Sequence, residues 1–269
     1  MVEAARLAEG FRALRSGKHA CWFPESRDDY AAGARTFAAQ ARSAGDRVLI
    51  VGERPSGSRG WPGEALVIDP AEVDGVFRDG LAPWELFPRL ARGAAADHGN
   101  PVRVLAQMTS LVPAGCGFDE LVALELGWGQ WAAGSGASVV CAFQQDGWHE
   151  SVLRDVACMH SGQVGDRRLT ANFRMTCLEP GWWKVDGVVD FVAASAFGAA
   201  VRGALARSDV VRLRFDGLEL IDAAGIQELV FSVRETRGAY VRVEAANPTV
   251  RRLWQLSGFD AVQQAVEFA

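Results

Sequence analysis

The sequence has few lysines, no paired cysteine motif and no long apolar run. Lysine occurs only at positions 18 and 184, and 28 basic residues are outnumbered by 33 acidic ones, which leaves a net charge of -5. An acidic chain has no strong nonspecific attraction for nucleic acid or for an anionic membrane surface. We therefore expect neither a nucleic-acid partner nor a membrane partner.

The cysteines and the apolar residues favour a cytoplasmic location. Five cysteines are an odd number and form no Cys-x-x-Cys motif, so we expect reduced thiols rather than a disulfide framework. No apolar run approaches the roughly 20 residues that a membrane-spanning helix needs. The N-terminus leads into an amphipathic helix, Ala4 to Arg15, and does not read as a secretory signal.

Motifs for nucleotide hydrolysis and for nucleophilic catalysis are missing as well. The Gly17-Lys18 pair lacks the first glycine of a phosphate loop, is followed by His19 instead of Ser or Thr, and precedes its strand. No Gly-x-Ser-x-Gly elbow occurs. An enzyme acting through His19, Cys21 and His160 is disfavoured because no carboxylate that would orient a base is identifiable. We expect no cofactor and no enzymatic activity.

What the chain does contain is an alternation of strands and helices. A length of 269 residues with 49% hydrophobic residues favours two domains, which we place at residues 1–170 and 178–269. In the first, helices near 28–44, 84–96, 118–133 and 148–159 separate strands near 19–23, 47–52, 65–68, 102–108 and 137–143. This order implies right-handed crossovers and a mainly parallel sheet with helices on both faces.

The second half reads as a smaller α/β domain. Its expected strands lie at 171–177, 182–189, 210–215 and 240–244, with a short closing strand, and its helices lie at 193–206, 224–237 and 248–256. Val185, Val188 and Phe191 are expected in the core of this domain. No internal repeat is present.

A tight acidic turn stands out between a strand and a helix in this half. Apolar residues dominate Val210 to Phe215, whereas Ile226, Leu229 and Val230 recur at helical spacing. Asp222 stands where an N-cap belongs, because its carboxylate can accept from the first free amides and suits the positive end of the helix dipole. The segment Asp222-Ala223-Ala224-Gly225 is therefore predicted to expose the start of a helix.

These segments, taken in order, resemble a STAS domain, the family of anti-sigma-factor antagonists. Val185–Asp190 corresponds to a strand carrying Gly and Asp, and Val210–Asp216 to the strand before the family's Asp-Ser-Ala/Ser-Gly motif. Leu253–Phe259 matches the closing pattern of Leu followed by Gly-Phe. The resemblance implies a role in transcription regulation in bacteria, with an anti-sigma factor of the protein-kinase type, or a related regulator, as partner.

One position departs from the family pattern. Ala223 occupies the place of the serine that accepts phosphate in kinase-switched antagonists, so this switch is not available there. The resemblance implies a docking patch made of Asp222, Ala223, Ala224, Gly225, Gln227 and Glu228. The alternative is a scaffold or assembly protein, since a STAS domain without its acceptor serine can serve as a structural copy in a homo-oligomer.

The first half resembles the MEDS domain, a family of bacterial sensory modules found in a dichloromethane-responsive repressor. The resemblance covers Gly17 to Asn172 and rests on His19 to Pro24, Tyr30, Gly45 to Leu49, Leu124-Glu125, Val140 to Phe143 and Met159-His160. It implies a RecA-like fold and the sensing of a small organic molecule. Gln107 and Phe143 depart from the family, where an acidic residue and tyrosine are common.

Candidate ligand-sensing residues follow from this resemblance and from the expected sheet. Ligands of open α/β sheets bind at the carboxyl ends of the strands, where polar residues collect. The candidates are His19, Cys21, Glu25, Glu53, Gln107, Glu125, Cys141 and His160. His19, Cys21, Cys141 and His160 are also zinc-type ligands, but they lack finger-type spacing, and buried Cys commonly serves as a small hydrophobe. We therefore expect no metal.

Overall fold

Two compact units, each built on one β-sheet, make up the chain. The computed structural model describes residues 2–52, 66–68, 100–112, 115–259 and 264–269. Met1–Cys116, Gly127–Leu153 and Gly162–Leu169 form the first unit, whereas Gly117–Leu126, Arg154–Ser161 and Thr170–Ala269 form the second. The helix expected at 84–96 lies outside the described residues, as does Glu53.

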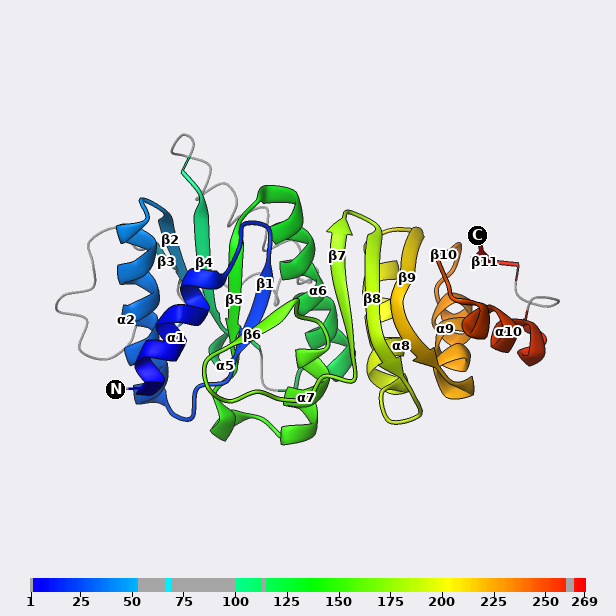
Figure 1. Ribbon diagram of the computed structural model, residues 1–269, viewed down its shortest axis with the longest axis horizontal. Coiled ribbons are helices and arrows are strands. Elements are labelled where there is room, and N and C mark those ends of the chain that lie inside the picture. Colours follow the sequence, from blue (N-terminus) through cyan, green and yellow to red (C-terminus); the bar gives the residue numbers. More distant parts are fainter. Residues whose placement is uncertain (1, 53–65, 69–99, 113–114, 260–263) are drawn as a thin grey trace. The chain divides into compact units, whose positions relative to one another are not determined.

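The sheet of the first unit has six strands in the order β3-β2-β4-β5-β1-β6 (Figure 1). All five pairings are parallel, which confirms the mainly parallel sheet expected from the sequence. β6 was not expected from the sequence. The strands are β1 (His19–Trp22), β2 (Arg47–Val51), β3 (Leu66–Ile68), β4 (Val102–Gln107), β5 (Ser138–Ala142) and β6 (Gly162–Val164).

Two helices of the first unit cover one face of this sheet. Phe11 of α1 (Val2–Ala13) and Phe37 of α2 (Arg27–Ser43) pack edge-to-face, with ring centroids 5.2 Å apart. Ala20 and Trp22 of β1 share their apolar cluster. Because side chains alternate along a strand, His19 and Cys21 face the opposite side of the sheet. The positions of these two residues therefore agree with the expectation that they share one face.

The remaining helices of the N-terminal half are short except for one. α6 is the 18-residue helix, and its Gly129 lies against the His19 ring, since a β-carbon there would be 3.4 Å from Nδ1. None of the described helices has both the length and the apolar character needed to span a membrane. The helices are α5 (Met108–Leu111), α6 (Phe118–Ser135), the 3-10 turn η2 (Gln145–Gly147) and α7 (Glu150–Ala157).

The sheet of the second unit has five strands in the order β11-β10-β9-β8-β7. β7 and β8 are antiparallel, whereas the other pairings are parallel. α8 and α9 pack on each other and on β9, and their buried residues Phe197, Ile226 and Leu229 join the main apolar cluster. The elements are β7 (Phe173–Glu179), β8 (Trp182–Val189), α8 (Ala194–Leu205), β9 (Val210–Ile221), α9 (Ala223–Glu235), β10 (Tyr240–Glu244), α10 (Pro248–Ser257) and β11 (Val266–Phe268).

Two features of the second unit differ from the sequence-based expectation. β9 continues to Ile221 instead of ending at Phe215, because shifts in its register with β8 accommodate Gly217 within the strand. Phe191 and Val188 were expected in the core, but the Phe191 side chain is 77% exposed and Val188 is only half-buried. The strand ends at Val189, so the alternation of inward and outward side chains no longer applies to Phe191.

Candidate functional site

The predicted acidic turn is present and joins β9 to α9. Asp222 is the N-cap of α9, with extended backbone angles, and its Oδ1 accepts a hydrogen bond from the Gly225 amide at 3.0 Å. The Asp222 amide donates to the Val189 carbonyl at 2.9 Å, which ties the turn to the end of β8. A carboxylate that caps a helix start satisfies one orphan amide and favours the positive end of the dipole. The turn is therefore fixed to α9 through the Asp222 carboxylate and to β8 through the Asp222 amide.

Gly225 lies beneath this turn rather than on its surface. A β-carbon at this position would lie 2.6 Å from Ile221 Cγ1 and 2.7 Å from Val189 Cγ1, which is closer than packed side chains allow. Only glycine therefore lets the first turn of α9 approach the ends of β8 and β9. Gly225 is buried, so its role in the candidate docking patch is to position the helix and not to contact a partner.

Exposed apolar side chains occur on the segments that lead into α9 and on α9 itself. Phe191 and Val192, which follow β8, are 77% and 61% exposed, and Leu220 near the end of β9 is 43% exposed. Val188 pairs with Leu220 and Val189 with Ile221, so these residues collect at one edge of the sheet. Ala223 and Gln227 are exposed on α9, and Phe231, one turn further, is 50% exposed. Grouped exposed apolar residues often mark interaction surfaces. We call the apolar residues Phe191, Val192, Leu220, Ala223 and Phe231 the apolar rim.

The other predicted docking residues, Ala224 and Glu228, are half-buried. Glu228 forms an ion pair with Arg202 of α8, with 3.5 Å between Oε2 and Nη1. Arg202 also donates to Asp119 at 2.7 Å and 3.1 Å. The hydrogen bond with Asp119 raises the pKa of Arg202, although partial burial opposes the shift. Glu228 is thus part of a local charge network beside the exposed face of α9.

In the first unit, two of the predicted ligand-sensing residues form a buried pair. His19 Nε2 lies 3.2 Å from Cys141 Sγ across the neighbouring strands β1 and β5. The exposed fraction is 4% for His19 and 0% for Cys141. Cys21, two residues along β1, takes no part in this pair, and its thiol lies 3.7 Å from the Gly162 carbonyl oxygen.

In the second unit, Glu125 and His160 form another buried pair. His160 Nε2 lies 2.8 Å from Glu125 Oε2, and both side chains are fully buried. His160 Nδ1 lies 2.7 Å from the Val156 carbonyl oxygen, which can only accept, so Nδ1 carries the proton. His19, Glu125, Cys141 and His160 are thus buried donors of the types that hold a metal ion.

The other predicted residues lie elsewhere. Gln107, at the end of β4, donates to the buried Gln144 side chain at 2.9 Å, which leaves these amides engaged with each other. Glu25 is exposed, and Glu53 lies outside the described residues.

Two further cysteines, Cys158 and Cys177, were not among the predicted site residues. Burial raises the pKa of Cys158 to about 12 and that of Cys177 to about 12. These two thiols therefore stay protonated at neutral pH and are poor nucleophiles.

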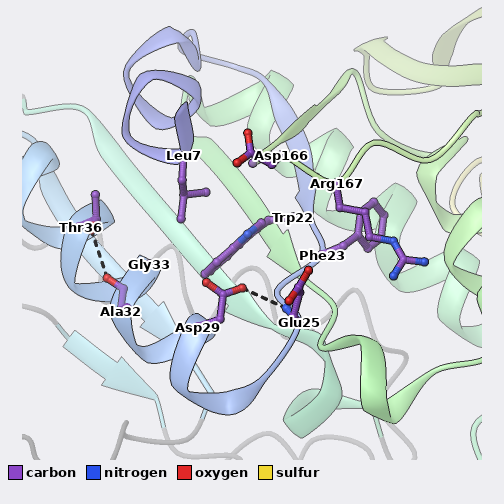
Figure 2. A pocket seen from close by; sticks show the side chains of 11 residues that line it. Leu7, Trp22, Phe23, Glu25, Asp29, Ala32, Gly33, Thr36, Asp166 and Arg167 are labelled. Carbon is purple, nitrogen blue, oxygen red and sulfur yellow. Dashed lines mark hydrogen bonds between the residues drawn. The ribbon is translucent and has the colours of Figure 1, made fainter. Parts of the chain in front are cut away.

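A cavity of about 360 Å³ opens beside the carboxyl end of β1. Trp22 forms one wall, and Glu25, Asp29 and Asp166 supply carboxylates (Figure 2). The Arg167 side chain extends away from Trp22 in this view, and it contacts Gln145 and Glu150. Asp166 pairs with Arg6 at 3.3 Å, whereas no described residue forms an ion pair with Glu25. The cavity thus combines an aromatic wall with negative charge.

Sequence reasoning found Glu25 but missed the other residues of this cavity. Ser26 was expected as a helix cap, and its Oγ indeed accepts from the Asp29 amide at 3.1 Å. Asp29 in turn accepts from the amide of Glu25, the residue before the N-cap, at 3.0 Å, which ties the chain entering α2 to its first turn. Asp166 follows the unpredicted β6, so no sequence signal placed it beside Trp22.

Two family models match this α/β chain, a sensory domain followed by a STAS domain, and this combination supports a signalling role. The chain belongs to the MEDS family, described as "MEthanogen/methylotroph, DcmR Sensory domain". The family model matches residues 18–161, which is more than half of the length of this chain. A second family model, "Mlab, STAS domain", matches residues 181–265. Both resemblances inferred from the sequence are thereby confirmed.

Among solved structures, the chain is similar to one described as "Structure of the Anti-Sigma Factor Antagonist SpoIIAA in its Unphosphorylated Form". The sequence identity is 17%, the match covers 34% of this chain and 98% of that chain, and the TM-score is 0.27. No curated protein matches this chain.

Proposed function

We propose that the chain is a non-catalytic regulator whose STAS domain docks on an anti-sigma factor or a related regulator. Its first domain senses a small organic molecule, and binding of that molecule controls the docking. The observation that carries the proposal is the apolar rim around the capped start of α9. A soluble partner that covered this rim would bury large apolar side chains that are otherwise exposed to water.

Control by a ligand would replace control by phosphate in this chain. Ala223 is exposed at the first position of α9, where a phosphoserine would place close to two negative charges beside Asp222. An alanine has no hydroxyl to accept phosphate, so the docking surface stays competent whether or not a kinase is active. A second input is then required if the interaction is to be regulated.

Phe191 should contribute strongly to docking, because it is the most exposed large apolar side chain of the rim. We expect Phe191→Asp to weaken binding of an anti-sigma factor by more than about tenfold, the result of losing a contact worth over about 1.4 kcal/mol. Isothermal titration of the full chain with a purified kinase-type anti-sigma factor measures this change.

Leu256 offers a matched control for this titration. Its side chain is 67% exposed on α10 and is not part of the apolar rim. Leu256→Asp introduces the same charge and should leave the affinity unchanged. Equal losses in the two variants, or no binding by the wild-type chain, would remove the docking proposal.

The cavity beside Trp22 is the proposed sensing site. Its carboxylates and indole favour a small organic cation, because aromatic faces and negative charges both attract cations. Tetramethylammonium should raise the melting temperature of the full chain by mass action, whereas tert-butanol, a neutral probe of similar size, should have a smaller effect. Glu25→Gln should weaken the response up to about fivefold, since an exposed charge pair contributes at most about 1 kcal/mol.

Glu9→Gln provides the control for a general effect of surface charge. Glu9 is exposed on α1 and does not line the cavity. If both variants lose the response equally, the cation acts through the net charge of the protein and not in the cavity. Failure of this test would leave the docking proposal standing, because the apolar rim is probed by a different ligand and different variants.

A further inference from the structure

The buried His19–Cys141 pair has a chemistry that neither docking nor the cavity uses. An imidazole and a thiol are brought together from strands that are 122 residues apart in sequence, on the face of the sheet away from α1 and α2. Buried cysteine alone serves as a small hydrophobe. A buried histidine in contact with its sulfur is different, since imidazole and thiolate are the preferred ligands of zinc.

The separation of the two donor atoms suits a shared metal ion. Zinc binds thiolate at about 2.3 Å and imidazole nitrogen at about 2.0–2.1 Å, which at a tetrahedral angle places the two atoms about 3.6 Å apart. The observed separation is 3.2 Å. Parallel pairing between β1 and β5 fixes both backbones, so a small outward shift of the side chains reaches the required distance.

We propose that the His19–Cys141 pair binds a divalent metal ion of the zinc class. Binding releases the thiol proton of Cys141 to solvent and leaves a thiolate–metal bond, so the affinity rises with pH. The pair supplies two of the four ligands of a tetrahedral ion. This site goes beyond the proposed function, and it replaces the sequence-based expectation that the chain holds no metal.

Cobalt is the probe, because thiolate-bound Co²⁺ absorbs light in the near ultraviolet. The purified full chain is stripped with a chelator, titrated with Co²⁺ and then challenged with Zn²⁺. We expect stoichiometric binding, a thiolate-to-cobalt absorption band that zinc removes, and a higher melting temperature with metal. Cys141→Ser should lose the band. Loss of a residue that only supports a metal ligand weakens metal affinity by about 10–100-fold, and His19→Ala, which removes a ligand itself, should weaken the cobalt affinity by more than that.

Cys21→Ser is the matched control, since Cys21 lies on β1 with its side chain on the same face as His19. It should keep the band and the affinity. Comparing each variant with the wild-type chain in chelator shows whether the apo form still folds, so that a lost band is not mistaken for unfolding. No band in the wild-type chain, or a band retained by Cys141→Ser, would overturn the proposal. The proposal would also be overturned if His160→Gln lost the metal while His19→Ala and Cys141→Ser kept it. The metal would then be bound by the Glu125–His160 pair.

Discussion

Replacing Gly187 by valine should destabilise the second unit by about 3 kcal/mol or more. Gly187 lies in β8 with φ at +92°, a conformation that β-branched residues rarely adopt. A β-carbon there would lie 2.6 Å from the Asn172 carbonyl oxygen, and this oxygen already accepts a hydrogen bond from the Val188 amide at 2.8 Å. Relief by backbone movement would therefore break that bond, so strain and overlap add together.

Urea denaturation of the full chain, followed by circular dichroism, measures this loss. Gly238→Val is the matched control, because Gly238 has a similar φ of +79° but no atom within 4 Å of the position where a β-carbon would lie. It should cost only the strain of the left-handed conformation, about 1–2 kcal/mol. Equal losses in the two variants would show that the contact with Asn172 is not what excludes a side chain at Gly187.

Much of the fold follows from local patterns, because the pattern and the packing agree at most positions. Continuous apolar runs such as Val48–Val51 predicted strands buried on both faces, and these strands are found in the six-stranded sheet. The expected strand at 210–215 was too short, because the pairing of β9 with β8 carries one strand through Gly217 to Ile221.

The candidate sites were less accessible to sequence reasoning, because they depend on pairings between distant strands. His19 and Cys21 are correctly expected on one face, but the pairing of β1 with β5 sets Cys141 opposite Cys21, and only the direction of the side chains brings His19 Nε2 within 3.2 Å of Cys141 Sγ. Cys21 has the same ligand chemistry and no part in that pair. The Asp222 turn was easier to predict, since a cap, its amides and the helix pattern lie within a few residues.

Reversing the charge at Asp222 should reduce anti-sigma factor binding by about 100-fold. Asp222 stands amid the apolar rim with the exposed Glu219 nearby on β9, so a partner that covers this surface needs complementary basic groups. Asp222→Arg would place a cation against them, and like charges across an interface cost several kcal/mol, with each 1.4 kcal/mol equal to tenfold in affinity. Titration calorimetry with the full chain and a purified anti-sigma factor measures the loss.

Loss of the helix cap must be separated from the reversal of charge. Asp222→Asn retains a good N-cap but removes the charge, so it should keep the stability of α9 and lose only part of the affinity. Asp209→Arg makes the same charge reversal at an exposed position before the opposite end of β9, and it should bind like the wild-type chain. If Asp222→Asn and Asp222→Arg bind equally well, the partner does not contact this carboxylate. If Asp209→Arg loses as much affinity as Asp222→Arg, the attraction is a property of net charge, and docking is not localised to the start of α9.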